Sequence, residues 1–173
     1  VVNKIRRIVG TKKVGHTGTL DPDAEGVLPI CINRGTKVAD MLTVSDKRYT
    51  AEFKLGIMTD TLDIGGTVLE ERDVNVTKQQ IIDAIKRFVG VIEQVPPMYS
   101  AIKVGGRKLC DLARKGIEVE RKSRTVEIYE INILDVKEES FTIDVKCSKG
   151  TYIRTLGSDI GEMLGCGAVM TKL

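Results

Sequence analysis

GHTGTLDPDAEGVLP, residues 15–29, gathers three glycines, the single histidine of the chain and three acidic residues into fifteen positions. Asp21 precedes a proline, which biases its backbone away from the α-helical region and toward an extended conformation. Glycines in the same stretch permit turns and a close approach of a ligand to the backbone. The stretch therefore predicts an active-site loop on which the carboxylate of Asp21 can meet a substrate.

The acids of this loop are spaced by two, like the first ligands of an EF-hand calcium loop. An EF-hand also needs a bidentate glutamate at its twelfth position, which is Ile32 here. Pro22 and the strand-like run that follows it do not suit the expected helix. Because His16 is the only histidine, a second metal ligand is hard to name, and we expect no metal site.

The length and charge of the chain limit its domain organisation and its partners. Its 173 residues fit one domain, and its formal net charge is +3 with a pI near 8.6. Net charge alone is weak evidence for a polyanionic partner, but clustered basic residues suit phosphate contacts on a folded RNA. Solvated helix faces would explain single clusters equally well. The clusters lie at residues 4–13, 103–115 and 121–124.

Cysteine spacing and hydropathy indicate the cellular compartment. The four cysteines are widely spaced and form no C-x-x-C pair, which predicts neither a zinc site nor a disulfide framework and favours a reducing cytoplasm. The chain has no run of 18 apolar residues and no signal-like start, so we expect neither a membrane span nor a secretion signal.

The first half of the chain shows both helical and strand periodicity. Apolar spacing predicts a helix over residues 1–9 that ends at Gly10. The run GVLPICI, residues 26–32, predicts a buried strand, and a short helix is expected over residues 36–42. Alternation over residues 48–55 predicts a half-buried strand. Its inward-facing residues are Tyr49, Ala51, Phe53 and Leu55.

The second half completes a mixed α+β domain. A capping box at residues 77–80 opens a helix that Gly90 stops, with an apolar face formed by Ile81, Ile82, Ile85, Phe88 and Val89. Two prolines and a Gly105-Gly106 turn interrupt the chain before a helical stretch at 107–115. Strands at 126–136 and 141–147 predict an antiparallel hairpin with a bulge near Tyr129. A final helix spans 151–164, and the whole predicts a largely antiparallel sheet flanked by helices.

An arginine near the carboxylate would complete the expected site. A nucleophilic carboxylate must stay ionised, and paired hydrogen bonds from a guanidinium would favour that state and orient it. Arg154, in the first turn of the final helix, is the candidate. From spacing alone it could instead pair with Asp159 or Glu162.

Four motifs together resemble the TruB family, the bacterial tRNA pseudouridine-55 synthases. They are GHTGTLDP at 15–22, DKRY at 46–49, TDTLDIGG at 59–66 and CSKGTYIRT at 147–155. The resemblance implies the pseudouridine synthase fold and the isomerisation of one T-loop uridine of tRNA after base flipping. It implies no metal or organic cofactor.

The resemblance also assigns roles to particular residues. It makes Asp21 the catalytic residue, Arg154 its ion-pair partner, and Tyr49 the ring that stacks on the target uracil and assists the later proton step. It gives His16 a part in opening the RNA loop and Asp60 a supporting role in the arginine and tyrosine network. The remaining substrate-binding residues expected are Tyr152, Leu173, Thr17, Gly18 and Lys47.

Domain organisation and partners follow in the same way. Residues 1–173 are expected to be the catalytic domain without an N-terminal strand and a C-terminal RNA-binding domain, and residues 97–124 an insertion that clasps RNA. The expected partner is the T-arm stem-loop of tRNA, with a monomeric enzyme, no obligate protein partner and no membrane. Guide-RNA-dependent relatives and a non-catalytic RNA-binding module remain alternatives, although the long insertion favours the stand-alone enzyme. Val169 departs from the histidine usual in the family.

Overall fold

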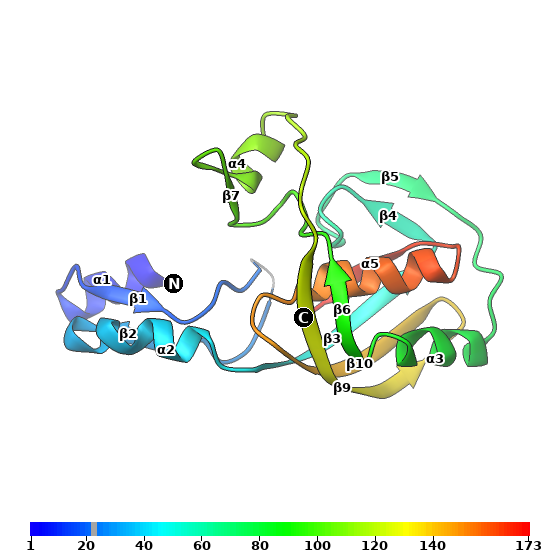
Figure 1. Ribbon diagram of the computed structural model, residues 1–173, viewed down its shortest axis with the longest axis horizontal. Helices are drawn as coiled ribbons and strands as arrows, with labels where there is room; N and C mark the ends of the chain where they lie inside the picture. Colours follow the sequence, from blue (N-terminus) through cyan, green and yellow to red (C-terminus); the bar gives the residue numbers. More distant parts are fainter. Residues whose placement is uncertain (22–23) are drawn as a thin grey trace.

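The computed structural model describes residues 1–21 and 24–173, so Pro22 and Asp23 of the calcium-loop comparison lie outside the described residues. At its centre is an antiparallel sheet of five strands in the order β11-β3-β10-β9-β6 (Figure 1). The predicted α+β class with a largely antiparallel sheet is confirmed. The strands are β3 (Lys47–Leu55), β6 (Gly90–Gln94), β9 (Arg124–Val136), β10 (Ser140–Cys147) and β11 (Ala168–Lys172).

One face of the sheet carries the main hydrophobic core. In β3, Ala51, Phe53 and Leu55 are each at most 1% exposed, while the residues between them are exposed, so the predicted alternation is confirmed. Phe53 stacks on Phe141 of β10 with ring centroids 4.9 Å apart. Helices α3 (Lys78–Lys86) and α5 (Ile153–Met163) pack their apolar residues into this same core.

Helix α3 begins at the predicted capping box. The Thr77 side chain accepts from the Gln80 backbone N–H, and the Gln80 side chain accepts from the Thr77 backbone N–H. The expectation that Val89 continues the buried face is wrong, since Val89 is 47% exposed. The helix ends at Lys86, so residues beyond it no longer follow its periodicity, and Gly90 starts the edge strand β6 with a positive φ of 110°.

The long hairpin of β9 and β10 contains the predicted bulge. Glu130 pairs with Lys146 and Ile128 pairs with Cys147, which leaves Tyr129 as the extra residue. A second irregularity, which the sequence did not predict, lies farther along the hairpin between Thr142 and Ile143.

The N-terminal residues form a separate small group beside the sheet (Figure 1). As predicted, α1 (Val2–Val9) ends at Gly10, which adopts a left-handed conformation. The strand expected over 26–32 is only β2 (Ile30–Ile32), paired with β1 (Val14–His16). Val27 is 92% exposed, and Pro29, which lacks an N–H, precedes the pairing. The helix expected at 36–42 is the 3-10 turn η1 (Asn33–Val38) followed by α2 (Ala39–Thr43).

Two segments leave the central sheet. The hairpin of β4 (Ile57–Thr59) and β5 (Val68–Glu71) follows β3. Between β6 and β9 the chain makes an excursion with the short hairpin β7 (Lys103–Val104) and β8 (Arg107–Lys108) and the helix α4 (Leu109–Ala113). Helix α4 starts two residues later than expected because Arg107 and Lys108 belong to β8. Residues 95–123 leave the central sheet and return to it at the same place, since Gln94 of β6 pairs with Arg124 of β9.

Helix α5 lies unusually close to the sheet. A Cβ atom on Gly157 would lie 2.0 Å from Cε1 of Phe53, and one on Gly161 would lie 2.2 Å from the backbone N of Ala168. This close packing fixes the helix whose first turn carries Arg154. At 11 residues, α5 is the longest helix in the described part of the chain, and no helix there is long and apolar enough to cross a bilayer.

Replacing Gly157 by alanine should therefore destabilise the protein by about 1–3 kcal/mol, because the buried ring of Phe53 cannot move away from the new methyl group. The matched control is Gly35→Ala in η1, where a Cβ meets nothing within 4 Å. Thermal unfolding of both variants checks this. An unchanged melting temperature for Gly157→Ala would contradict the proposed packing constraint.

Candidate active site

Asp21 and Arg154 lie 133 positions apart in the sequence and form an ion pair. Nε of Arg154 lies 3.0 Å from Oδ2 of Asp21, and Nη2 donates a 3.0 Å hydrogen bond to Oδ1. The Arg154 side chain is 8% exposed and the Asp21 side chain 28% exposed. A two-point contact of this kind fixes both the charge and the orientation of a carboxylate.

The rest of the Arg154 guanidinium is also held by oxygen atoms of the described residues. Nη1 donates to the backbone O of Thr61 at 2.7 Å and to Oδ2 of Asp63 at 3.3 Å, and Nη2 donates to the backbone O of Tyr99 at 3.0 Å. One buried cation therefore faces two carboxylates and two carbonyls, as a buried charge requires.

The alternative partners considered from helical spacing do not apply. Glu162 lies 3.6 Å from Arg72 instead. Asp159 is half-buried on α5, and its burial together with the nearby charge of Glu162 raises its pKa to about 6. Neither residue neutralises Arg154.

The second carboxylate on Arg154 was not selected from the sequence. Oδ1 of Asp63 accepts from the Thr61 hydroxyl at 2.8 Å and from the Gly65 N–H at 3.1 Å, which leaves Oδ2 for Arg154. Asp60, chosen as the supporting acid, accepts from the Thr67 N–H at 2.8 Å and from the Tyr99 hydroxyl at 3.2 Å. Asp60 thus contacts Tyr99, whose carbonyl in turn binds Arg154. The only available signal for Asp63 was the second aspartate of TDTLDIGG.

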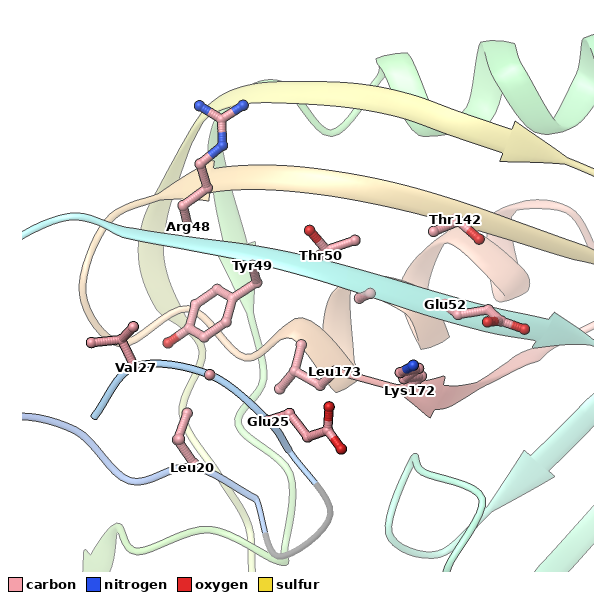
Figure 2. A pocket seen from close by; sticks show the side chains of 12 residues that line it. Leu20, Glu25, Val27, Arg48, Tyr49, Thr50, Glu52, Thr142, Lys172 and Leu173 are labelled. Atoms are coloured by element: carbon pink, nitrogen blue, oxygen red, sulfur yellow. The ribbon is translucent and has the colours of Figure 1, made fainter.

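A cavity of about 480 Å³ opens beside Tyr49 (Figure 2). This volume is within the usual range for small-molecule sites. Tyr49 and Leu173 both line it, together with Leu20 and residues 25–27 of the candidate loop. The backbone N–H of Glu25 donates to the carbonyl of Leu173 at 3.0 Å, which ties the loop to the end of the β11 segment.

Tyr49 is electrostatically linked to Asp21. Burial of the ring, followed by the nearby Cys147 group and the Asp21 carboxylate, raises the pKa of Tyr49 above its ordinary value of 10.0. The side chain is therefore a neutral phenol at physiological pH, able to donate a hydrogen bond.

The other residues selected from the sequence have local surroundings of their own. Tyr152 immediately precedes α5, so its backbone sets the start of the Arg154 helix. His16 is exposed at the end of β1, and its Nδ1 is hydrogen-bonded to the carbonyl of Gly18. Thr17 is 4% exposed. Lys47 points its ammonium group to the carbonyls of Ser45, at 2.6 Å, and Thr43, at 3.4 Å, rather than to a site residue.

No group of three or more potential metal ligands occurs within residues 1–21 and 24–173. Three of the four cysteines, Cys31, Cys147 and Cys166, are buried, and burial raises the pKa of the Cys147 and Cys166 thiols. The site itself contains a paired carboxylate, a guanidinium and a phenol.

Comparison with known proteins identifies the family of the chain. Residues 6–153 match the family model described as TruB family pseudouridylate synthase (N terminal domain). The tRNA pseudouridine synthase B of Alkaliphilus oremlandii is 54% identical over 173 residues, covering 100% of this chain and 58% of that protein. The protein of the same name from Clostridium kluyveri is 55% identical over 173 residues, covering 100% of this chain and 60% of that protein. The chain thus spans 58–60% of the length of these relatives.

Solved structures show the same fold at lower identity. A Cbf5-Nop10-Gar1 complex contains a chain that is 33% identical, with a TM-score of 0.74 over 99% of this chain and 42% of that chain. An archaeal box H/ACA sRNP Nop10-Cbf5 complex gives 30% identity and a TM-score of 0.68, over 99% of this chain and 40% of that chain. The family model, the relatives and the fold agree, and the chain belongs to the TruB family of pseudouridylate synthases.

Proposed function

We propose that this chain is the catalytic part of a tRNA pseudouridine synthase that isomerises the T-loop uridine 55 of tRNA. The observation that carries the proposal is the carboxylate of Asp21, held at two points by a buried arginine and linked electrostatically to Tyr49, which lines a cavity of about 480 Å³. Relatives with at least 54% identity carry the name tRNA pseudouridine synthase B. That identity, against 33% for the Cbf5-containing complex, supports the stand-alone enzyme over the guide-dependent type.

The reaction conserves all atoms of the uridine. A stacked base must first be extruded from the loop, at a cost of a few kcal/mol that RNA contacts offset. Asp21 then attacks either C6 of the base or C1′ of the ribose, and both routes need an ionised carboxylate. The N1–C1′ bond breaks, the base rotates and a C5–C1′ bond forms. The bond from Asp21 to C6 or C1′ breaks again and frees the carboxylate, C5 loses its proton and N1 gains one.

Arg154 would keep Asp21 ionised and aligned through both halves of this reaction. Its own position is fixed by Thr61, Asp63 and Tyr99, so the arginine brings a pre-arranged charge to the carboxylate. Pre-arranged charges need no reorganisation when the reaction occurs. Asp63 acts through Arg154 and is a positioning residue.

Tyr49 would stack on the uracil and assist removal of the C5 proton. Because its raised pKa keeps it a neutral phenol, it cannot accept that proton as a phenolate at neutral pH. Tyr49 can take up the C5 proton only if it releases its own hydroxyl proton at the same time. It would therefore relay the proton to solvent. Leu173 and Tyr152 would complete the base pocket.

Binding of the tRNA stem-loop would come mainly from residues 97–124. A second cavity there, of about 480 Å³, is lined by the basic side chains of Lys103, Arg107, Lys108 and Lys115 and by one acid, Asp111. Such a cationic surface suits the phosphates of folded RNA. We assign residues 97–124 as the RNA-clasping insertion and His16, Thr17, Gly18 and Lys47 as contacts to the T-loop of a tRNA bound by a monomeric enzyme.

Replacing Asp21 by asparagine should abolish catalysis and spare binding. We expect release of tritium from uridine C5 of a T-arm stem-loop to fall about 1,000-fold or more in the full-length protein, because the amide is not a nucleophile. Exposed Asp83→Asn on α3 is the matched control. Release by neither the parent nor the variant, with RNA binding intact, would instead favour a non-catalytic RNA-binding module or a guide-dependent enzyme.

The same substitution should lower the pKa of Tyr49. Removing the negative charge of Asp21 makes the phenolate less unfavourable, while burial, the larger cause, still holds the pKa above 10.0. Alkaline titration of phenolate absorbance measures this, with a Tyr49→Phe variant subtracted to isolate the residue. A Tyr49 pKa unchanged by Asp21→Asn would refute the electrostatic link.

Neutralising the second cavity should weaken RNA binding without changing the chemical step. For Arg107→Gln with Lys108→Gln, we expect about a tenfold loss of stem-loop affinity and a salt-dependence slope shallower by about 2. The rate at saturating RNA should be retained. Lys86→Gln with Arg87→Gln at the exposed end of α3 is the matched control. Equal losses of RNA affinity in the two double variants would show that the effect comes only from the change in net charge.

A further inference from the structure

Gln94 is a buried amide that the proposed mechanism does not use. It ends β6 and is 1% exposed. Its Oε1 accepts from the backbone N–H of Tyr152 at 3.0 Å, and its Nε2 donates to the backbone O of Tyr152 at 3.3 Å. One backbone group is an N–H donor and the other a carbonyl acceptor, so together they fix which way the side-chain amide is oriented. Gln94 therefore bonds to both backbone groups of Tyr152, as the backbone of a neighbouring β-strand would.

The contact lies where two parts of the site meet. Tyr152 precedes α5 without a side-chain cap, and its carbonyl also accepts from Leu156 N–H, at 3.0 Å, in the first turn of the helix. Arg154 follows two residues later. On the other side, Gln94 is the residue from which the excursion of residues 95–123 departs, and Tyr99 of that excursion accepts from Arg154 at 3.0 Å.

We infer that Gln94 is a positioning residue for the isomerisation, which holds the start of α5 against the root of the excursion and thereby sets the geometry of Arg154 and Asp21. Arg154 has little room to adjust, because its contacts to Asp21, Thr61, Asp63 and Tyr99 span only 2.7–3.3 Å. A displacement of about 1 Å in a catalytic group can reduce a rate on the order of 100-fold. The inference rests on the proposed function of the Asp21 site.

Substitutions at Gln94 can separate its two hydrogen bonds from its volume. Methionine fills similar space but can make neither bond. Glutamate keeps an acceptor for the Tyr152 N–H, and it donates to the Tyr152 carbonyl only when its carboxyl group is protonated. Gln79→Met, at an exposed position on α3, controls for the change of side chain.

The experiment compares single-turnover rates of the full-length variants on a T-arm stem-loop, and measures RNA affinity in the Asp21→Asn background. For Gln94→Met we expect a rate loss of about 100-fold with affinity changed less than about threefold. For Gln94→Glu we expect a rate, relative to the parent, that falls as pH rises and the buried carboxyl group ionises. A rate within about threefold of the parent for Gln94→Met would overturn the inference.

Two further results guard against a purely structural explanation. If Gln94→Met fails to fold, the pH profile of Gln94→Glu decides, and a ratio to the parent that does not fall with rising pH overturns the inference. Amide hydrogen exchange over residues 150–158 should accelerate in Gln94→Met, and unchanged exchange also overturns it. An inactive parent would defeat the proposed function, whereas an active parent with an unaffected Gln94→Met would defeat only this inference.

Discussion

The buried guanidinium of Arg154 is the constraint on which the site depends. A buried cation is stable only when oxygen atoms surround it, since the cost of removing a charge from water is several kcal/mol. Three distant segments supply those atoms to the Arg154 side chain of α5: the Asp21 loop, the turn with Thr61 and Asp63, and the excursion with Tyr99. Folding around this charge therefore brings the candidate active-site loop to the same place as the segment proposed to hold RNA.

Local periodicity predicted the elements that form the core but not the contacts between them. The inward face of β3, the capping box of α3 and the bulge at Tyr129 each follow from neighbouring residues, and each is present. The prediction of a strand before Ile30 was wrong, because an apolar run interrupted by proline does not by itself form a sheet edge. Periodicity likewise placed Val89 on a helix that had already ended.

The choice between Asp60 and Asp63 shows where sequence reasoning reaches its limit at the site. Both acids belong to one short motif, and only three-dimensional turn geometry distinguishes them. The turn is so tight that a Cβ on Gly66 would lie 2.2 Å from the Thr61 hydroxyl oxygen. In this turn, Asp63 reaches Arg154, whereas Asp60 reaches Tyr99. The pairing of Asp21 with Arg154 followed from family resemblance, because helical spacing alone allowed Asp159 or Glu162.

The charge balance of the site separates the proposed catalysis from the proposed RNA affinity. Arg154 is fully engaged by two carboxylates and two carbonyls, so it has no capacity left to attract a phosphate. The pair of carboxylates around one cation leaves a local excess of negative charge, which repels a polyanion. Under the proposed function, attraction of RNA would therefore come from basic residues elsewhere, as along β7, β8 and α4. Salt would then weaken the proposed capture of RNA, while the buried ion pair between Asp21 and Arg154 is much less screened.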